Sequence, residues 1–140
     1  AKNNMGYAYL EEQMELIKES CDKNTALIIG LGVNDLKYSR QKYIDTINEM
    51  AQDMDCHIFY MLVNPVDEKK EEQHGYSVEN DVIDDFNSVM EEELSSDVRI
   101  IDTNSYLKEE GFETVDGLHY DRSTYKLIYD YIKECVNKAE

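Results

Sequence analysis

A chain of 140 residues fits a single domain, and its 41% hydrophobic and 10% aromatic content indicates a folded core rather than disorder. The formal net charge of -17 would repel phosphate backbones and anionic lipid surfaces, so the composition argues against nucleic-acid and membrane partners. No apolar run reaches the roughly 18 residues that a membrane-spanning helix needs.

Apolar periodicity predicts alternating helices and strands in the first half of the chain. Apolar residues recur at three- and four-residue steps over 7–21, which predicts an amphipathic helix. The short apolar run 26–31 has the pattern of a buried parallel strand. The same two patterns predict a second helix over 44–54 and a second strand over 57–63.

The second half of the chain continues this alternation. The charged segment 67–73 is expected to be a solvated loop, or the start of a helix, with solvation the favoured interpretation. A third helix is predicted over 82–94, a shorter strand over 98–101 and a last helix from 122 onward. Helices and strands in this order predict one α/β domain with a parallel sheet between two layers of helices.

Polar side chains follow each predicted strand. Asn34 and Asp35 follow the first strand, Asn64 follows the second, and residues 102–104 follow the third. The segment 116–119, before the last helix, can reach the same edge. Because ligands of such folds bind beyond the carboxyl ends of the strands, we expect these residues to converge.

Asp116 and His119 are the leading catalytic candidates. An acid three residues before a histidine can hold one imidazole nitrogen by a hydrogen bond and leave the other nitrogen free as a base. The alternatives are an ordinary surface or capping histidine and an Asp-Gly turn at 116–117. The glycine between the pair and the expected position at the sheet edge favour the catalytic interpretation.

Asn34 is the candidate donor to a developing oxyanion. Its amide follows a buried strand, where it could stabilise negative charge on a reacting carbonyl oxygen. An Asn-Asp pair at such a position is also frequently a turn or a helix cap. The pattern is weak alone and becomes stronger when it is paired with the Asp-x-x-His segment.

The remaining reactive residue types suggest packing rather than chemistry. Cys21, Cys56 and Cys135 are odd in number and far apart, so we expect free structural thiols. No histidine or cysteine pair has zinc-ligand spacing, and we expect neither a metal nor a cofactor. Four tyrosines near the C-terminus are expected to serve packing rather than a sugar-stacking platform: Tyr120, Tyr125, Tyr129 and Tyr131.

These motifs resemble those of the SGNH, or GDSL-type, hydrolase superfamily. The sequence around the motifs is similar to that of bacterial, clostridial-type members. That family carries Gly-Asp-Ser, a glycine, Gly-x-Asn-Asp and Asp-x-x-His in chain order. Residues 32–35 match the third block and residues 116–119 match the fourth. The resemblance implies that Gly6, Asn34 and Gly32 serve the oxyanion or the substrate, and that Asp116 and His119 are catalytic.

The Gly-Asp-Ser block is absent from the chain. The resemblance implies that the nucleophilic serine and the strand before it lie outside these 140 residues, so we expect an N-terminally incomplete domain that is inactive alone. One edge of the sheet would then be uncovered, for a second chain or a second copy of this one to fill.

The implied activity is hydrolysis of a small acyl ester, such as an acetyl group on a carbohydrate. A non-catalytic carbohydrate-binding module with the same fold is the alternative. A flavodoxin-like nucleotide or cofactor binder is disfavoured because no glycine-rich phosphate loop follows any strand. Compartment, acyl group and alcohol are left open.

Overall fold

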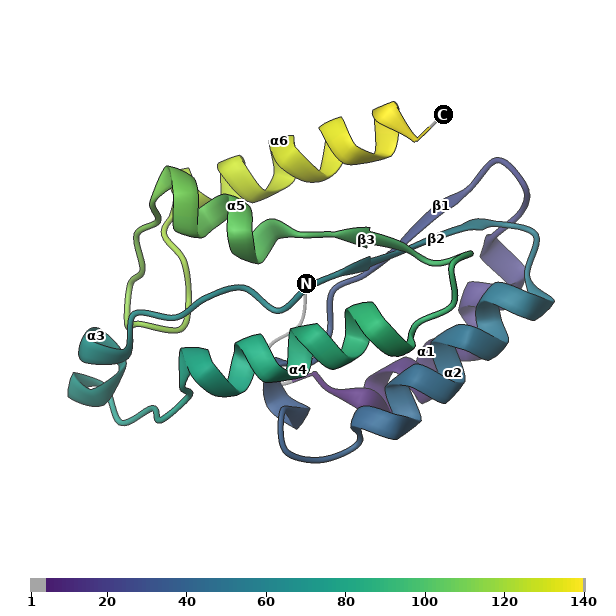
Figure 1. Cartoon of the computed structure of the whole chain (residues 1–140). Coiled ribbons are helices and arrows are strands. Elements are labelled where there is room, and N and C mark those ends of the chain that lie inside the picture. Colours follow the sequence, from purple (N-terminus) through teal and green to yellow (C-terminus); the bar gives the residue numbers. More distant parts are fainter. Residues whose placement is uncertain (1–4, 140) are drawn as a thin grey trace.

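The computed structural model describes residues 5–139 and contains a sheet of three parallel strands (Figure 1). The strands are β1 (Ala26–Ile29), β2 (His57–Met61) and β3 (Arg99–Ile101), in the order β1-β2-β3. Ala26 pairs with His57, and Phe59 pairs with Arg99, so the carboxyl ends of all three strands meet at one edge.

Helices cover both faces of this sheet. One face carries α1 (Tyr7–Ser20), α2 (Arg40–Asp53) and α4 (Asn80–Glu93), and the other carries α5 (Thr103–Glu110) and α6 (Arg122–Lys138) (Figure 1). The short elements η1 (Val33–Asp35) and α3 (Glu68–Gln73) lie in the loops that follow β1 and β2. The predicted three-layer α/β/α fold is confirmed. Among residues 5–139, no helix has both the length and the apolarity to cross a membrane.

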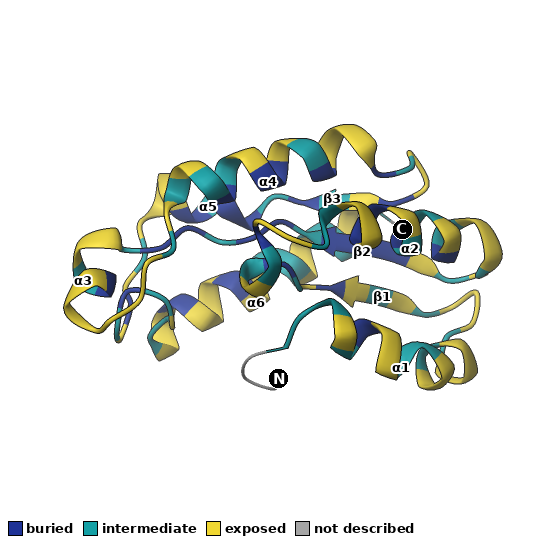
Figure 2. Ribbon diagram, turned by 90° about the horizontal axis from the view of Figure 1, so that it is seen from below, coloured by how far each residue is buried: buried dark blue, intermediate teal, exposed yellow. Residues whose placement is uncertain are grey.

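Side chains of β2 alternate between the two faces of the sheet, so this strand contacts the helices of both layers. Ile58 and Tyr60 of β2 point into the larger core, which they share with α2 and α4, whereas Phe59 between them faces the opposite layer. All three side chains are buried, and dark blue marks the buried residues of β2 and of the helices in Figure 2. A strand buried on both faces has the continuous apolar sequence that 57–63 shows.

Two further helices form: α3, which is the helical alternative considered for 67–73, and α5, which was not predicted. The solvation expected for 67–73 was wrong in part: α3 is capped by Asp67, whose side chain accepts from Lys70 N–H, and its Glu71 is 1% exposed. Asp102 likewise caps α5 by accepting from Ser105 N–H at 2.9 Å. Both helices have mostly polar sequences, so neither has the apolar stripe from which a helix is predicted.

The edge of β1 is uncovered within the described chain, as expected. In the sheet formed by residues 5–139, β1 pairs with β2 alone, and Ile28 on this strand is 39% exposed. A groove runs along this edge between β1 and α1, lined by Leu10, Ile17 and Leu27 among others. The sheet therefore has room for another strand beside β1.

Two asparagines of α4, the buried Asn87 and the half-buried Asn80, bind the segment that follows β2. Asn87 of α4 accepts from Val63 N–H and donates to Val63 C=O, both at 2.9 Å. Asn80 holds both polar backbone groups of Val66 in the same way, at 2.9 and 2.8 Å. These paired bonds replace ladder partners that the segment lacks, so the loop leaving β2 is rigid where the candidate site begins. Cys21, Cys56 and Cys135 are free thiols, as predicted.

Candidate active site

The Asp116–His119 pair is in direct contact. Asp116 Oδ2 lies 2.7 Å from His119 Nδ1, and Asp116 Oδ1 accepts from the backbone N–H groups of His119 and Leu118 at 2.7 and 3.0 Å. The expected hydrogen bond is therefore present. In this hydrogen bond His119 Nδ1–H donates to Asp116, which leaves Nε2 as the imidazole nitrogen available for a reaction.

The electrostatics of the pair favour a charged Asp116. Burial alone would raise the pKa of its carboxyl group. The His119 backbone N–H, the His119 ring and the Leu118 N–H outweigh that effect and lower the pKa to about 2. Asp116 is thus an anion across the neutral range and can stabilise an imidazolium that forms beside it.

Gly117 seats this loop on α3. Its backbone has a φ of 94°, and a Cβ atom there would lie 2.3 Å from Glu71 N and 2.7 Å from Asp67 O. Gly117 C=O accepts from Asp67 N–H at 2.9 Å, and Lys70 Nζ donates to Thr114 C=O. The segment 67–73, predicted to be solvated, is therefore the support on which the Asp116–His119 loop rests.

Glu71 lies buried beneath the loop with one carboxylate oxygen unpartnered. Its Oε1 accepts from Val78 N–H at 3.1 Å, whereas the buried Oε2 has no hydrogen-bond partner among the described residues. Burial raises the pKa of Glu71, and the nearby charges of Glu68 and Asp116 raise it further. No local pattern indicates this burial, because an acidic run is usually solvated.

We expect Glu71→Gln to increase the free energy of unfolding near pH 8 and to change it little near pH 4. A carboxyl group with a raised pKa stabilises the fold fully below its unfolded pKa, and that contribution falls as the pH rises through the folded value. Glutamine resembles the protonated acid and removes this dependence. Urea unfolding of both proteins between pH 4 and pH 8 measures it, and an equal effect at both ends would contradict the account.

Asn34 and Gly6 lie near each other at the carboxyl end of β1. Asn34 Nδ2 donates to Met5 C=O at 3.0 Å, which leaves its second amide hydrogen free. Asp35 Oδ2 accepts from Tyr7 N–H at 2.9 Å and from Tyr43 Oη at 2.7 Å. Asp35 thus ties the start of α1, and Gly6 with it, to η1.

The two glycines of the predicted site have close neighbours. A Cβ on Gly6 would lie 2.4 Å from Asp35 Oδ2, and one on Gly32, whose φ is 144°, would lie 2.9 Å from Val63 Cγ2. Gly32 is buried and contributes to the cavity wall, where it allows the turn from β1 into η1. Direct roles for Gly6 and Gly32 toward an oxyanion stay predictions.

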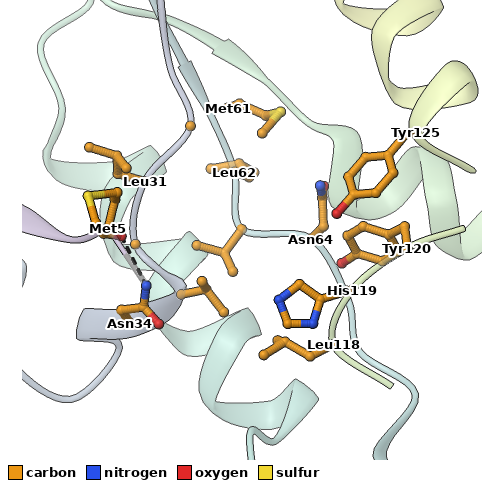
Figure 3. Close-up of a pocket in the computed structure, with 14 residues that line it drawn as sticks. Met5, Leu31, Asn34, Met61, Leu62, Asn64, Leu118, His119, Tyr120 and Tyr125 are labelled. Atoms are coloured by element: carbon orange, nitrogen blue, oxygen red, sulfur yellow. Dashed lines mark hydrogen bonds between the residues drawn. The ribbon is translucent and has the colours of Figure 1, made fainter. Parts of the chain in front are cut away.

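A cavity of about 280 Å³ brings the two halves of the site together (Figure 3). Asn34 lies on one wall with Met5 and Leu31, and His119 lies opposite and points into the cavity (Figure 3). The floor is apolar and includes Leu62. No serine, threonine or cysteine of residues 5–139 lines this space, so the described part of the chain presents a base without a nucleophile.

Further residues surround His119. Asn64, expected at this edge of the sheet, lines the cavity, and so does Tyr125, for which packing was expected. The Tyr76 ring, which no sequence pattern indicated, lies edge-on to the imidazole with centroids 6.0 Å apart. Two of the C-terminal tyrosines differ in their surroundings: Tyr131 of α6 stacks on Tyr106 of α5, while Tyr125 is 51% exposed at the cavity. Within residues 5–139, no three acidic, histidine or cysteine side chains are grouped to hold a metal ion.

Comparison with known proteins supports the architecture. No family model and no curated protein matches the sequence. Among solved structures, the fold is similar to that of a lipase/acylhydrolase from Enterococcus faecalis, with a TM-score of 0.64 and 16% sequence identity over 88% of this chain. The chain spans 65% of the length of that protein. At this identity the likeness concerns the fold alone, which is a three-layer α/β/α arrangement.

Proposed function

We propose that this chain is the larger part of an SGNH-type serine esterase, of the bacterial, clostridial-like kind suggested by its motifs. The observation that carries the proposal is the Asp116–His119 hydrogen bond of 2.7 Å beside a cavity whose other wall presents Asn34. This arrangement supplies an oriented base and an amide donor on opposite sides of one small space, as acyl transfer requires.

The reaction would follow the usual course of a serine hydrolase. A serine oxygen attacks the ester carbonyl carbon while His119 Nε2 takes the serine proton. The carbonyl oxygen becomes an oxyanion, which Asn34 and the Gly6 backbone stabilise; one such donor typically contributes about 3 kcal/mol. His119 then gives the proton to the departing alcohol oxygen. In the second half of the reaction, water attacks the acyl-serine, His119 takes the water proton and passes it to the serine oxygen, and the acid is released.

The serine would come from outside the 140 residues. The uncovered edge of β1 supports this proposal, because a strand added there would end beside Asn34 and His119, at the carboxyl edge of the sheet. Either a preceding segment or a second chain could provide it. The small apolar floor of the cavity favours a short acyl group, such as acetyl, on a carbohydrate or a similar alcohol.

A non-catalytic carbohydrate-binding module is the second candidate. The observation in its favour is that no serine, threonine or cysteine lies on the cavity wall formed by the described residues. Such a module would bind glycans in the same cavity without turnover.

A fluorophosphonate probe, which reacts with activated serines, would test the esterase proposal. We expect the full gene product to hydrolyse p-nitrophenyl acetate and to be labelled once, on a serine outside these 140 residues, whereas the 140-residue chain alone is neither active nor labelled. A label on a serine within residues 5–139 would overturn the assignment of the nucleophile. Full-length protein that has an upstream Gly-Asp-Ser but no esterase activity would favour the binding module.

A further inference from the structure

Asn64 occupies a prominent place in the cavity and has no role in the proposed reaction. It follows β2, half-buried, and its Oδ1 accepts from the Thr103 hydroxyl group at the start of α5. Thr103 is fully buried and its hydroxyl also lies 3.3 Å from Leu62 C=O, so it is a fixed support. With Oδ1 engaged, the Asn64 amide hydrogens are the polar groups left for the cavity.

Tyr125 provides a second polar group on the same wall. It lies on the first turn of α6, and its ring contacts the Tyr120 ring edge-on with centroids 5.7 Å apart. Tyr120 is held in turn, because its hydroxyl donates to Pro65 C=O at 2.6 Å. The Tyr125 side chain is therefore positioned although it is half-exposed, and Figure 3 shows it beside Asn64, on the same side of the cavity as His119.

We propose that Asn64 and Tyr125 form a subsite for the alcohol part of the ester. The inference rests on the proposed function, in which His119 must deliver its proton to the departing alcohol oxygen. The alcohol must then lie on the His119 wall, which carries Asn64 and Tyr125, while the oxyanion faces Asn34 on the opposite wall. The Asn64 amide donates to an oxygen of the alcohol, and the exposed Tyr125 ring covers its apolar face.

The chemistry of the wall identifies a neutral, hydroxyl-rich alcohol, such as a sugar. No lysine, arginine, aspartate or glutamate of residues 5–139 lines the cavity, so a charged alcohol would lose its hydration without gaining an opposite charge. An amide, a phenol and an aromatic ring face instead suit hydroxyl groups and the C–H face of a pyranose. This assigns a function to Tyr125, for which the sequence favoured packing.

Two acetyl esters that differ only in their alcohol test the subsite. The full gene product would be assayed on methyl 6-O-acetylglucopyranoside, whose three other hydroxyl groups are free, and on ethyl acetate by titration of released acid, as wild type and as Asn64→Ala, Tyr125→Ala and Tyr129→Ala. We expect the ratio of kcat/KM for the sugar ester to that for ethyl acetate to fall about five- to tenfold in the first two variants. Tyr129, exposed on α6 and absent from the cavity wall, is the control and should leave the ratio unchanged.

A binding measurement separates failure of the subsite from failure of the esterase proposal. Methyl glucopyranoside, the alcohol product, would be titrated into the isotopically labelled protein, with the side-chain amide signal of Asn64 followed by NMR. A shift of that signal without any esterase activity would retain the subsite and reject the esterase. Ester hydrolysis with an unchanged ratio in both variants would reject the subsite and retain the esterase, and the absence of any shift would reject the subsite as well.

Discussion

His119→Ala should reduce kcat/KM for p-nitrophenyl acetate by about a thousandfold or more in the full gene product, because both proton transfers of the reaction depend on its Nε2. The substitution should leave the loop intact. Asp116 still accepts from the backbone N–H groups of residues 118 and 119, which an alanine retains, and the His119 side chain is 46% exposed. The loss would therefore reflect chemistry rather than unfolding.

His57→Ala is the control for this prediction. His57 is an exposed residue at the first position of β2, at the opposite end of the strand from the candidate site. Its removal should leave kcat/KM unchanged, and circular dichroism should confirm that both variants are folded. Activity that survives His119→Ala at the level of His57→Ala would mean that another base serves the reaction, and the proposed dyad would have to be abandoned.

The parts of the fold that could be predicted are those encoded by local apolar pattern. The three strands appear in the sequence as short apolar runs because both faces of the sheet are covered, and the Asp116–His119 contact spans three residues of chain. Local spacing was sufficient in both cases. By contrast, α5 begins with polar residues whose burial is decided by distant partners, such as Thr103, which reaches Leu62, 41 positions away.

The rest of the site could not be predicted because it depends on contacts between distant segments. Asn87 is a polar residue within a helix, and nothing near it in the sequence indicates that its amide forms hydrogen bonds with the backbone of Val63, 24 positions earlier. Glu71 belongs to a charged run, and its burial follows from the loop at Gly117 lying against it. The apolar pattern of a segment predicts the conformation of that segment. A buried polar contact can be predicted only when the distant segment that packs against it is known.

Gly117→Ala should produce the largest loss of stability among single substitutions at the site, about 3 kcal/mol in the free energy of unfolding. Alanine would be strained at a φ of 94°, and its Cβ would meet the Glu71 backbone, 2.3 Å from N and 2.5 Å from Cα, where no side-chain rotation can relieve the clash. The loop would have to lift from α3, and His119 would move with it, so esterase activity should fall together with stability.

Gly111→Ala isolates the contribution of that contact. Gly111 has a similar φ of 86°, but a Cβ there has no neighbour within 4 Å, so the same substitution brings backbone strain without a clash. It should cost about 1 kcal/mol. Urea unfolding of both variants measures the difference. If Gly117→Ala is no less stable than Gly111→Ala, then α3 is not the support of the Asp116–His119 loop, and the Asp116–His119 geometry must be held from within residues 114–121 alone.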